Sequence, residues 1–440
     1  MLVKPRVRVV RCAPKTHPCP ACGKRGRRKR HLHRRIRSLA YRQEAHLDVH
    51  YAEYRSRCSC RKYFRSWPID VPAKSDYDEQ VRKAVLDRLL DDGLNVERTR
   101  ACMKRDFLLD LSSGFVYDCL DWQLARLNLP EHRRATLENF SGTLCVDELR
   151  LGKNTLLLAT DPLSDEIVAF ALVGANDSAH MRRFLLMLKY WGFLPLVVIS
   201  DGSNLYPASL AEVWPAAAHQ LCVFHVLQDV TKKVLDAVRR LRRACERRGR
   251  GGRKRKRGRP SAKARKRRVS KGPTAKEKAA FVFRRRYLIV KRAENLSEQE
   301  RADLEVMFGY EAELKTLWEF SQEIYKVWQT EQSRKVARWR WSRLKDNKAY
   351  EEIPELAEVL EWLDGQKMDK TQAFCGQPEG QRQKTNNHVE RTNRKLRFDE
   401  KARYKWRKRQ SIVRFILLKI SRHVPQPRTV EQQPPPKGGG

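Results

Sequence analysis

Three acidic residues stand in segments whose pattern suits metal-dependent chemistry. Asp147 lies within CVDELRLGK, Asp201 ends the apolar run of VVISDGSNLYP, and Glu390 lies in KTNNHVERTNRKLR, 189 residues further on (390 − 201). Isolated carboxylates of this kind can hold two divalent metal ions, and two such ions can promote an in-line displacement at phosphorus. In a chain this basic, a phosphodiester backbone is the expected substrate.

The composition of the chain indicates a polyanionic partner. Lys and Arg total 93 among 440 residues against 52 Asp and Glu, which leaves a formal net charge of +41. Nucleic acid is the commonest polyanion for such a chain, and an acidic membrane surface is the alternative. No apolar run approaches the ~18 residues of a spanning helix, and MLVKPRVRVVRC lacks the apolar region of a signal peptide. A cytoplasmic, nucleoid-associated protein without membrane contact is therefore expected.

The eleven cysteines fit the same compartment. Their number is odd, and a reducing cytoplasm disfavours disulfides, so a disulfide scaffold is not expected. Some of the cysteines should bind metal, and most of the others should be buried thiols.

Residues 141–238 are expected to form the sheet that positions the first two carboxylates. TLCVDEL, NTLLLAT and EIVAFALV predict three strands, and SAHMRRFLLMLKYWG predicts a helix. PLVVIS predicts a strand that ends at Asp201, followed by the helix LYPASLAEVWP, the strand AHQLCVFH and the helix VLQDVTKKVLDAVRRL. This order is that of an RNase H-like α/β fold, in which the first and fourth strands are neighbours. Such a fold would bring Asp147 and Asp201 together, and their mutual repulsion would then require a cation such as Mg²⁺.

Residues 380–425 are expected to complete this catalytic core with helices that carry Glu390. On a helix, Glu390 and Asn393 share a face with the arginines four and seven residues after Glu390. A carboxylate flanked by an amide and guanidinium groups suits a metal site beside a DNA backbone, so Asn393 is a candidate supporting residue. Taken alone, Glu390 also fits an ordinary helix salt bridge. The candidate DNA-binding residues of this segment are Arg394, Lys395 and Arg397.

Residues 239–275 are expected to form a basic disordered segment. The stretch 239–271 holds 19 Lys or Arg and one acidic residue, Glu246, and cannot bury a core. It could be a solvated linker or a clamp on the DNA backbone. The residues proposed for the clamp are Arg253, Lys254, Arg255, Lys256 and Arg257.

Residues 276–370 return to amphipathic patterns such as ADLEVMFGYEAELKTLWEFSQEIYKVW and predict a helical insertion before Glu390. Within it, Trp339 and Trp341 could stack on extruded bases, but helix-core packing is the simpler interpretation. The tail, residues 426–440, is of low complexity and is expected to be disordered.

Residues 1–72 are expected to form a small zinc-binding module. Cys19 and Cys22 form a CxxC pair, and Cys58 and Cys60 form a CxC pair. Two such pairs fit a tetrahedral Cys₄ site for a structural Zn²⁺ ion, with Gly23 relieving the tight turn. Reduced, unligated thiols are the alternative. The residues that could replace one of the ligands are Cys12, His17, His31 and His33.

Two basic segments accompany this module. GKRGRRKRHLHRRIR, residues 23–37, is expected to be helical and to present positive charge to phosphates. Residues 76–130 predict helices interrupted at Gly93 and near Ser112 or Ser113, either of which could cap a helix. Helix, short break and helix beside basic residues favour a helix-turn-helix DNA-binding domain, with a plain helical connector as the alternative.

Taken together, these segments resemble bacterial insertion-sequence transposases of the DDE type, and most closely the ISL-three group. The matching pieces are CPACG with CSC, VDE at residues 146–148, SDGSNLYP, LCVFHV and TNNHVERTNRKLR, which cover most of residues 15–425. The resemblance implies that Asp147, Asp201 and Glu390 are the catalytic triad. It also implies that Cys222 and His225 form the C-x-x-H signature that many such transposases carry between the second Asp and the Glu.

The C-x-x-H pair has a second interpretation. Cys222 could be a core residue of a buried strand, and His225 the first residue of a helix. A supporting role in the active site is favoured for His225. Zinc is not expected at this pair, because no second pair of ligands accompanies it in the sequence.

The resemblance implies an enzyme that binds the terminal inverted repeats of its element in double-stranded DNA. With two Mg²⁺ (or Mn²⁺) ions, it would cut at the element's ends and join the freed 3′-hydroxyl to target DNA. Two ends must be held together, so a homodimer or larger assembly is expected. Three alternatives remain: a DNA-binding regulator that uses only residues 1–130, a structure-specific nuclease on the same fold, and an RNA-binding protein driven by the basic segment.

Overall fold

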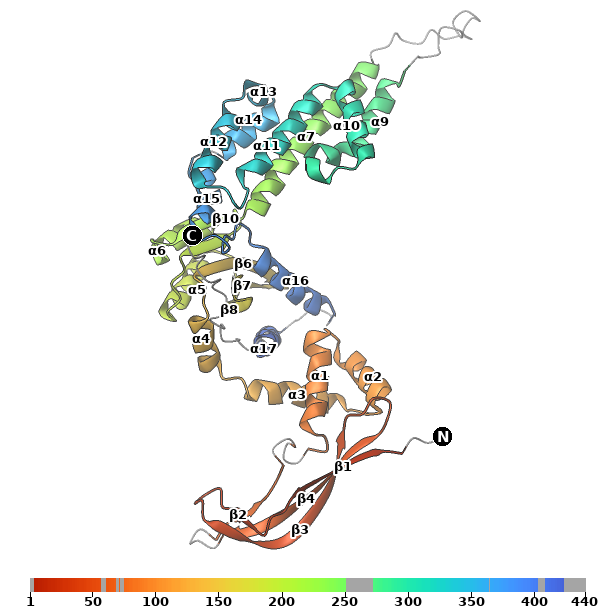
Figure 1. Cartoon of the computed structure of the whole chain (residues 1–440), viewed down its shortest axis with the longest axis vertical. Coiled ribbons are helices and arrows are strands. Elements are labelled where there is room, and N and C mark those ends of the chain that lie inside the picture. Colours follow the sequence, from red (N-terminus) through yellow and green to blue (C-terminus); the bar gives the residue numbers. More distant parts are fainter. Residues whose placement is uncertain are drawn as a thin grey trace, which may run out of the picture. The chain divides into compact units, whose positions relative to one another are not determined.

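The computed structural model of the chain describes residues 4–56, 61–68, 71, 75–250, 272–363, 365–402 and 408–422 (Figure 1). The chain divides into two compact units. The first comprises residues 1–136, 150–154 and 392–440, and the second comprises residues 137–149 and 155–391. None of the helices in the described ranges combines the length and the apolar character that a bilayer-spanning segment needs.

The first unit contains a five-stranded sheet in which β1, β4, β3 and β2 are successive neighbours, while β5 also pairs with β4. β4 pairs in parallel with β1 and antiparallel with β3. Alternate β4 side chains, including Leu47 and Val49, are buried with Ile36 of β3 in a small core. The strands are β1 (Arg6–Cys12), β2 (Thr16–Pro18), β3 (Arg25–Ser38), β4 (Ala45–Ser56) and β5 (Tyr63–Arg65).

The prediction of a helix over residues 23–37 is wrong, because most of this segment forms β3. Most of the β3 side chains are exposed, and Gly26 and Ile36 are its buried residues. The conformation is set by the neighbouring strand, since β3 pairs with β4 from Gly26–Ser56 to Ser38–Ala45 around one irregularity. The strongly alternating burial pattern of β4 therefore determines the structure of its basic partner.

Helices follow this sheet, as the sequence pattern of residues 76–130 predicted. Ser112 is the residue that caps α3, because its Oγ accepts a hydrogen bond from the backbone N–H of Phe115 at 3.0 Å. Gly93, with φ of +69°, lies in the break before the second helix. The elements are α1 (Glu79–Leu86), continued by η1 (Asp87–Asp91), then α2 (Val96–Phe107), α3 (Ser113–Ala125) and α4 (Leu129–Glu138).

The helix α17 (Arg409–Ile420) packs with this group and not with the catalytic core, where residues 380–425 were expected to lie. The Gln123 amide of α3 donates to Ser421 Oγ at 3.1 Å, and Arg414 pairs with Asp121. Burial of Ile412 and Ile416 indicates that α17 contributes an apolar face to the first unit.

The second unit contains a mixed five-stranded sheet with the order β10-β9-β6-β7-β8. The order of elements along the chain is the one that the sequence predicted. α5 (Ser178–Tyr190) and α6 (Tyr206–Val213) share a core with residues of β6 to β9, such as Leu144 and Val198. This arrangement fits an RNase H-like catalytic domain. The strands are β6 (Thr143–Leu151), β7 (Asn154–Asp161), β8 (Glu166–Val173), β9 (Val197–Ser200) and β10 (Ala218–Leu221).

A helical insertion follows β10 and includes the long helix α7 (Val223–Arg250), which lies beside α9, α10 and α11 in Figure 1. The basic segment expected to begin at residue 239 is therefore helical up to Arg250, because Leu241 continues the apolar face of α7 into the core. Trp341 is buried as predicted, whereas Trp339 is 56% exposed. The other elements are α9 (Ala275–Arg285), η2 (Arg286–Val290), η3 (Ala293–Asn295), α10 (Glu298–Tyr310), α11 (Glu313–Val327), α12 (Arg334–Lys345), α13 (Lys348–Glu351), α14 (Pro354–Trp362), α15 (Gln366–Thr371), η4 (Ala373–Gly376) and α16 (Asn387–Ala402).

Candidate active site

The register between β6 and β9 concerns the segments that carry two of the acidic residues. These strands are parallel, with Thr143 opposite Val197 and Cys145 opposite Ile199. Asp147 lies two residues beyond Cys145 on β6, and Asp201 lies two residues beyond Ile199, directly after the end of β9. Both residues are half-buried. Asp201 follows the last residue of β9, and its carboxylate accepts the backbone N–H of Ser203 at 2.9 Å.

Strand alternation separates Asp147 from its neighbour Glu148. Glu148 is hydrogen-bonded by the buried Tyr206 hydroxyl of α6 and by the Asn176 amide at 3.4 Å. Burial raises the pKa of Glu148, and the Asp201 carboxylate adds to the rise, against the effect of the Tyr206 hydrogen bond. Glu148 is therefore held within the protein, on the side of β6 that faces α6.

Asn386 carries the chain back to the sheet after the helical insertion. Its side-chain amide donates to the Val146 carbonyl of β6 at 2.9 Å, and its backbone N–H donates to Cys222 Sγ at 3.2 Å. Two residues earlier, the Lys384 carbonyl accepts the Val223 backbone N–H at 2.9 Å. Because α16 begins at the next residue, these bonds fix the start of the helix that carries Glu390.

His388 provides a second attachment in the first turn of α16. It is buried, and its Nε2 lies 2.6 Å from the carboxylate of Asp165 in the turn between β7 and β8. Asn386 and His388 together tie the residues before Glu390 to two parts of the sheet. This network brings Asn386, directly before α16 and four residues before Glu390, to β6.

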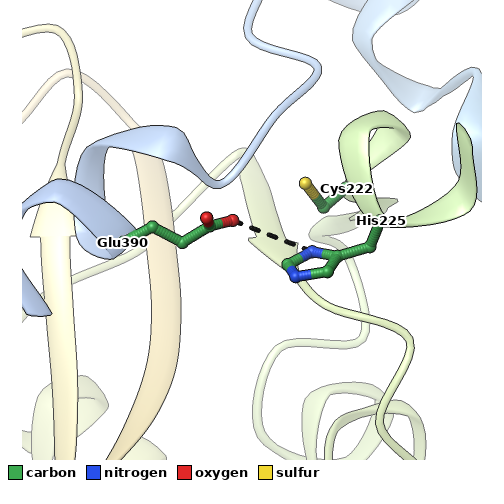
Figure 2. Close-up of side chains that lie close together, drawn as sticks. All are labelled: Cys222, His225 and Glu390. Carbon is green, nitrogen blue, oxygen red and sulfur yellow. Dashed lines mark ion pairs between the residues drawn. The ribbon is translucent and has the colours of Figure 1, made fainter. Parts of the chain in front are cut away.

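Glu390 lies closest to the C-x-x-H pair (Figure 2). Among the residues that the structure describes, a single group of three Cys, His, Asp or Glu side chains has all its ligand atoms within 4.8 Å: Cys222, His225 and Glu390. His225 Nδ1 and Glu390 Oε1 form an ion pair at 3.8 Å. Both atoms are buried and have no hydrogen-bond partner.

The surroundings of His225 favour its charged form. The adjacent Cys222 sulfur, together with the carboxylates of Glu390 and Asp201, raises the pKa of His225 to about 9, although burial acts in the opposite direction. An imidazolium next to Glu390 attracts its carboxylate. Among the described residues, the three acids do not form a close group of their own, and Glu390 lies against His225.

The other predicted residues of α16 divide by exposure. Asn393 is buried, whereas Arg394, Lys395 and Arg397 are exposed. From Thr392 onward the chain belongs to the first unit, so the boundary between the units crosses α16 directly after Arg391. The predicted clamp residues, Arg253, Lys254, Arg255, Lys256 and Arg257, lie outside the described residues.

The amino-terminal CxxC pair forms a tight turn. The backbone N–H groups of Cys22 and Gly23 donate to the Cys19 carbonyl at 3.3 and 2.8 Å, and Gly23 has φ of +69°, as its predicted role requires. A backbone hydrogen bond from Ala21 lowers the pKa of the Cys19 thiol. Cys58 and Cys60 lie outside the described residues, so the second half of the predicted zinc site does too.

Sequence reasoning missed three residues of this region: Asn386, Tyr206 and His388. Each carries a polar group that is buried and bonded far along the chain, such as Asn386 to Val146 across 240 residues. The available signals were NNHV directly before Glu390 and GSNLYP directly after Asp201. Neither pattern indicates a specific distant partner.

The match to a family model decides the class of this protein. Residues 144–408 match the model of the DDE transposases of the ISL-three group, described as transposase, which is more than half of the chain. The chain belongs to this transposase family. Members of such families cut DNA and transfer its strands, and DDE transposases generally use divalent metal ions.

The transposase is similar to the Drosophila P element transposase strand transfer complex, with 11% sequence identity and a TM-score of 0.40 over 80% of this chain and 92% of that chain. No curated protein matches this transposase.

Proposed function

We propose that this transposase binds the terminal inverted repeats of an insertion sequence and catalyses DNA cleavage and strand transfer through Asp147, Asp201 and Glu390. The observation that supports the proposal is the parallel β6–β9 register, which would set Asp147 opposite Asp201 if it continued two residues beyond Cys145 and Ile199. Glu390 is added by the bonds of Asn386, which hold the start of α16 against β6. The family membership supplies the reaction class.

The donor set suits Mg²⁺ or Mn²⁺. Asp147, Asp201 and Glu390 offer carboxylate oxygens, which such hard cations prefer. When bound, two such ions would increase the nucleophilicity of the attacking hydroxyl and neutralise the charge on the leaving oxygen.

The protein's own residues would position these groups. Asp147 is held by the pairing of β6, and Asp201 by its bond to the Ser203 N–H. His225, through its ion pair, would orient the Glu390 carboxylate. Asn393 would support this segment, and the exposed cations of α16 would contact DNA phosphates, which fixes register but carries no sequence information. These cations are Arg394, Lys395 and Arg397.

Recognition of the ends would come from the first unit. The Cys19–Cys22 turn and the Cys58–Cys60 pair would hold a structural Zn²⁺ ion. In support, Cys22 Sγ lies 3.8 Å from Ser56 Oγ, and Ser56 precedes Cys58 by two residues. The helices α2 and α3, joined by residues 108–112, would form the helix-turn-helix. Arg253, Lys254, Arg255, Lys256 and Arg257 would add contacts to the backbone.

Strand transfer requires two ends at once, so the active form would be a homodimer or a larger assembly on double-stranded DNA. Double-stranded DNA as the substrate would place the protein at the bacterial nucleoid in the cytoplasm.

The test is Asp201→Asn, assayed with linear DNA that carries the element's ends, a target plasmid and Mg²⁺. Loss of one carboxylate ligand should lower cleavage on the order of 10³-fold, because a metal ion contributes several kcal/mol to such a transition state. The affinity for the element's ends, measured by mobility shift, should stay within about twofold of wild type. The reason is that the variant keeps every Lys and Arg side chain that could contact a phosphate. Asp229→Asn is the matched control, because Asp229 is exposed on α7 and loses the same charge.

If Asp201→Asn still cuts DNA, the assignment of Asp201 to the catalytic triad is wrong. A wild-type protein that binds the ends without cutting them would support the regulator instead. Cutting of branched DNA in preference to the element's ends would support the structure-specific nuclease.

A further inference from the structure

The C-x-x-H pair and Glu390 have the chemistry of a second kind of metal site. Cys222 Sγ, His225 and Glu390 offer one sulfur, one nitrogen and one oxygen, all within 4.8 Å of one another. Thiolate and imidazole ligands select borderline-soft ions such as Zn²⁺, whereas Mg²⁺ prefers an all-oxygen set. We propose that these three residues bind one Zn²⁺ ion at a site distinct from the carboxylate pair of Asp147 and Asp201.

The distances between the ligand atoms are slightly longer than those of a tetrahedral site with zinc bound. Zinc–ligand bonds of about 2.0–2.3 Å in a tetrahedron put ligand atoms about 3.3–3.6 Å apart. His225 Nδ1 and Glu390 Oε1 are 3.8 Å apart, and the group as a whole lies within 4.8 Å. Side-chain rotations that move the ligand atoms by about 1 Å would bring all three within bonding distance of a Zn²⁺ ion. The fourth position would remain for water, as in sites with three protein ligands.

Two buried atoms lack partners that the ion would supply. His225 Nδ1 and Glu390 Oε1 are both buried, and apart from their ion pair with each other at 3.8 Å they have no hydrogen-bond partner. Unpaired buried polar atoms are uncommon, and a bound ion is one of their ordinary explanations. Both atoms point to the space between α7 and α16 in Figure 2, on the side where Cys222 also lies.

The third ligand is positioned by its own neighbours. The Asn386 backbone N–H donates to Cys222 Sγ at 3.2 Å, and Cys222 immediately precedes the first residue of α7. Outer-shell bonds of this type orient metal ligands. Asn386 also fixes the start of α16, so one residue holds both sides of the group. The sequence did not indicate zinc here, because the third ligand comes from a segment 165 residues beyond His225 (390 − 225).

The test uses the full-length protein with Co²⁺ as a spectroscopic substitute for Zn²⁺. The parent carries Cys19→Ser and Cys22→Ser, which removes thiolates of the amino-terminal turn. In this parent, Co²⁺ should give a thiolate-to-metal absorption band that Zn²⁺ displaces. Cys222→Ser should remove the band and one equivalent of tightly bound Zn²⁺, and His225→Gln should weaken Zn²⁺ binding at least about tenfold. Cys245→Ser, on the same helix α7, is the matched control and should retain the band.

An unchanged band and Zn²⁺ stoichiometry in Cys222→Ser would overturn the site. If Cys222→Ser fails to fold by circular dichroism, His225→Gln decides, and unchanged Zn²⁺ affinity in that variant overturns the site as well. The proposal shares Glu390 with the proposed function, so Asp201→Asn separates the two. That variant should retain the Cys222-dependent band, whatever happens to DNA cleavage.

Discussion

The two five-stranded sheets of this transposase are built from opposite kinds of strand. In the second unit, β9 is buried at every position, and β6 is largely apolar until Asp147. In the first unit, β3 is 14 residues long and mostly exposed, and its sequence RGRRKRHLHRRIRS is dominated by cations. The first kind of strand holds a few acids rigidly inside a core, whereas the second displays many cations to solvent. If the proposed function holds, catalysis and electrostatic attraction would belong to separate sheets.

The largest expected effect tests the acidic sheet by comparing adjacent residues. Asp147→Asn should reduce cleavage on the order of 10³-fold, because it removes a proposed metal ligand. Glu148→Gln should reduce cleavage by about tenfold or less. Glu148 is engaged by Tyr206, and burial already raises the pKa of its carboxyl, so the neutral amide is a close substitute. Single-turnover cleavage of end-containing DNA measures both.

Equal losses in the two variants would contradict the assignment of opposite faces of β6. A larger loss in Glu148→Gln would make Glu148 the metal ligand in place of Asp147.

The second prediction tests whether the two sheets have separate cores. Ile36→Ala in β3 should cost about 2–5 kcal/mol, as expected for a fully buried isoleucine. The loss should appear as faster hydrogen exchange in β1 to β5, with β6 to β10 unaffected. Leu144→Ala in β6 is the reciprocal variant and should affect the second sheet alone. Faster exchange in both sheets from either variant would show that they unfold as one unit.

The same contrast explains what the sequence could predict. A strand such as VVIS is buried on both faces, so its own apolar residues determine its structure, and Asp201 at its end could be located directly. β3 was expected to be a helix because its own residues have neither strand periodicity nor apolar content. Its structure depends on the alternation within β4, which belongs to a different segment.

Glu390 shows the corresponding limit for the site. Its segment predicted a helix and a basic surface, and α16 is present with Arg394 and Arg397 exposed. Its proximity to Cys222 and His225 depends on hydrogen bonds of Asn386 to distant backbone and sulfur atoms. The placement of α17 with the first unit has the same cause, since contacts such as Gln123 to Ser421 span 298 residues. Long-range pairing of this kind leaves no periodic signal in a single sequence.

The third prediction concerns that long-range attachment. Asn386→Ala should cost about 1–3 kcal/mol, because it removes a buried hydrogen bond from the Asn386 amide to the Val146 carbonyl. It should also lower cleavage up to about 10²-fold, since a displacement of about 1 Å at a catalytic group can have that effect. Chemical denaturation and cleavage rates measure the two losses.

Gln220→Ala is the matched control for Asn386→Ala. Gln220 is a buried amide that bonds the Thr371 carbonyl and the Phe374 N–H, at 2.9 and 2.7 Å, without holding α16. It should lose similar stability and less cleavage. If both variants lose cleavage in proportion to stability, Asn386 has no specific positioning role.

The smallest expected effect tests the basic sheet. Arg27 and Lys29 are exposed on β3, whereas Arg35 donates two hydrogen bonds to Asp48, at 2.8 and 3.2 Å. Arg35 is the largest cause of the lowered pKa of Asp48, so its charge is partly neutralised within the sheet. If β3 attracts the DNA backbone, Arg27→Gln with Lys29→Gln should reduce the slope of log K against log salt by about 0.9 for each phosphate that the variant no longer neutralises. Arg35→Gln should change the slope less, because it also frees the Asp48 carboxylate. Equal slopes in wild type and the double variant would place the electrostatic attraction elsewhere and leave β3 a solvated strand, and the separation between the two sheets would then concern structure alone.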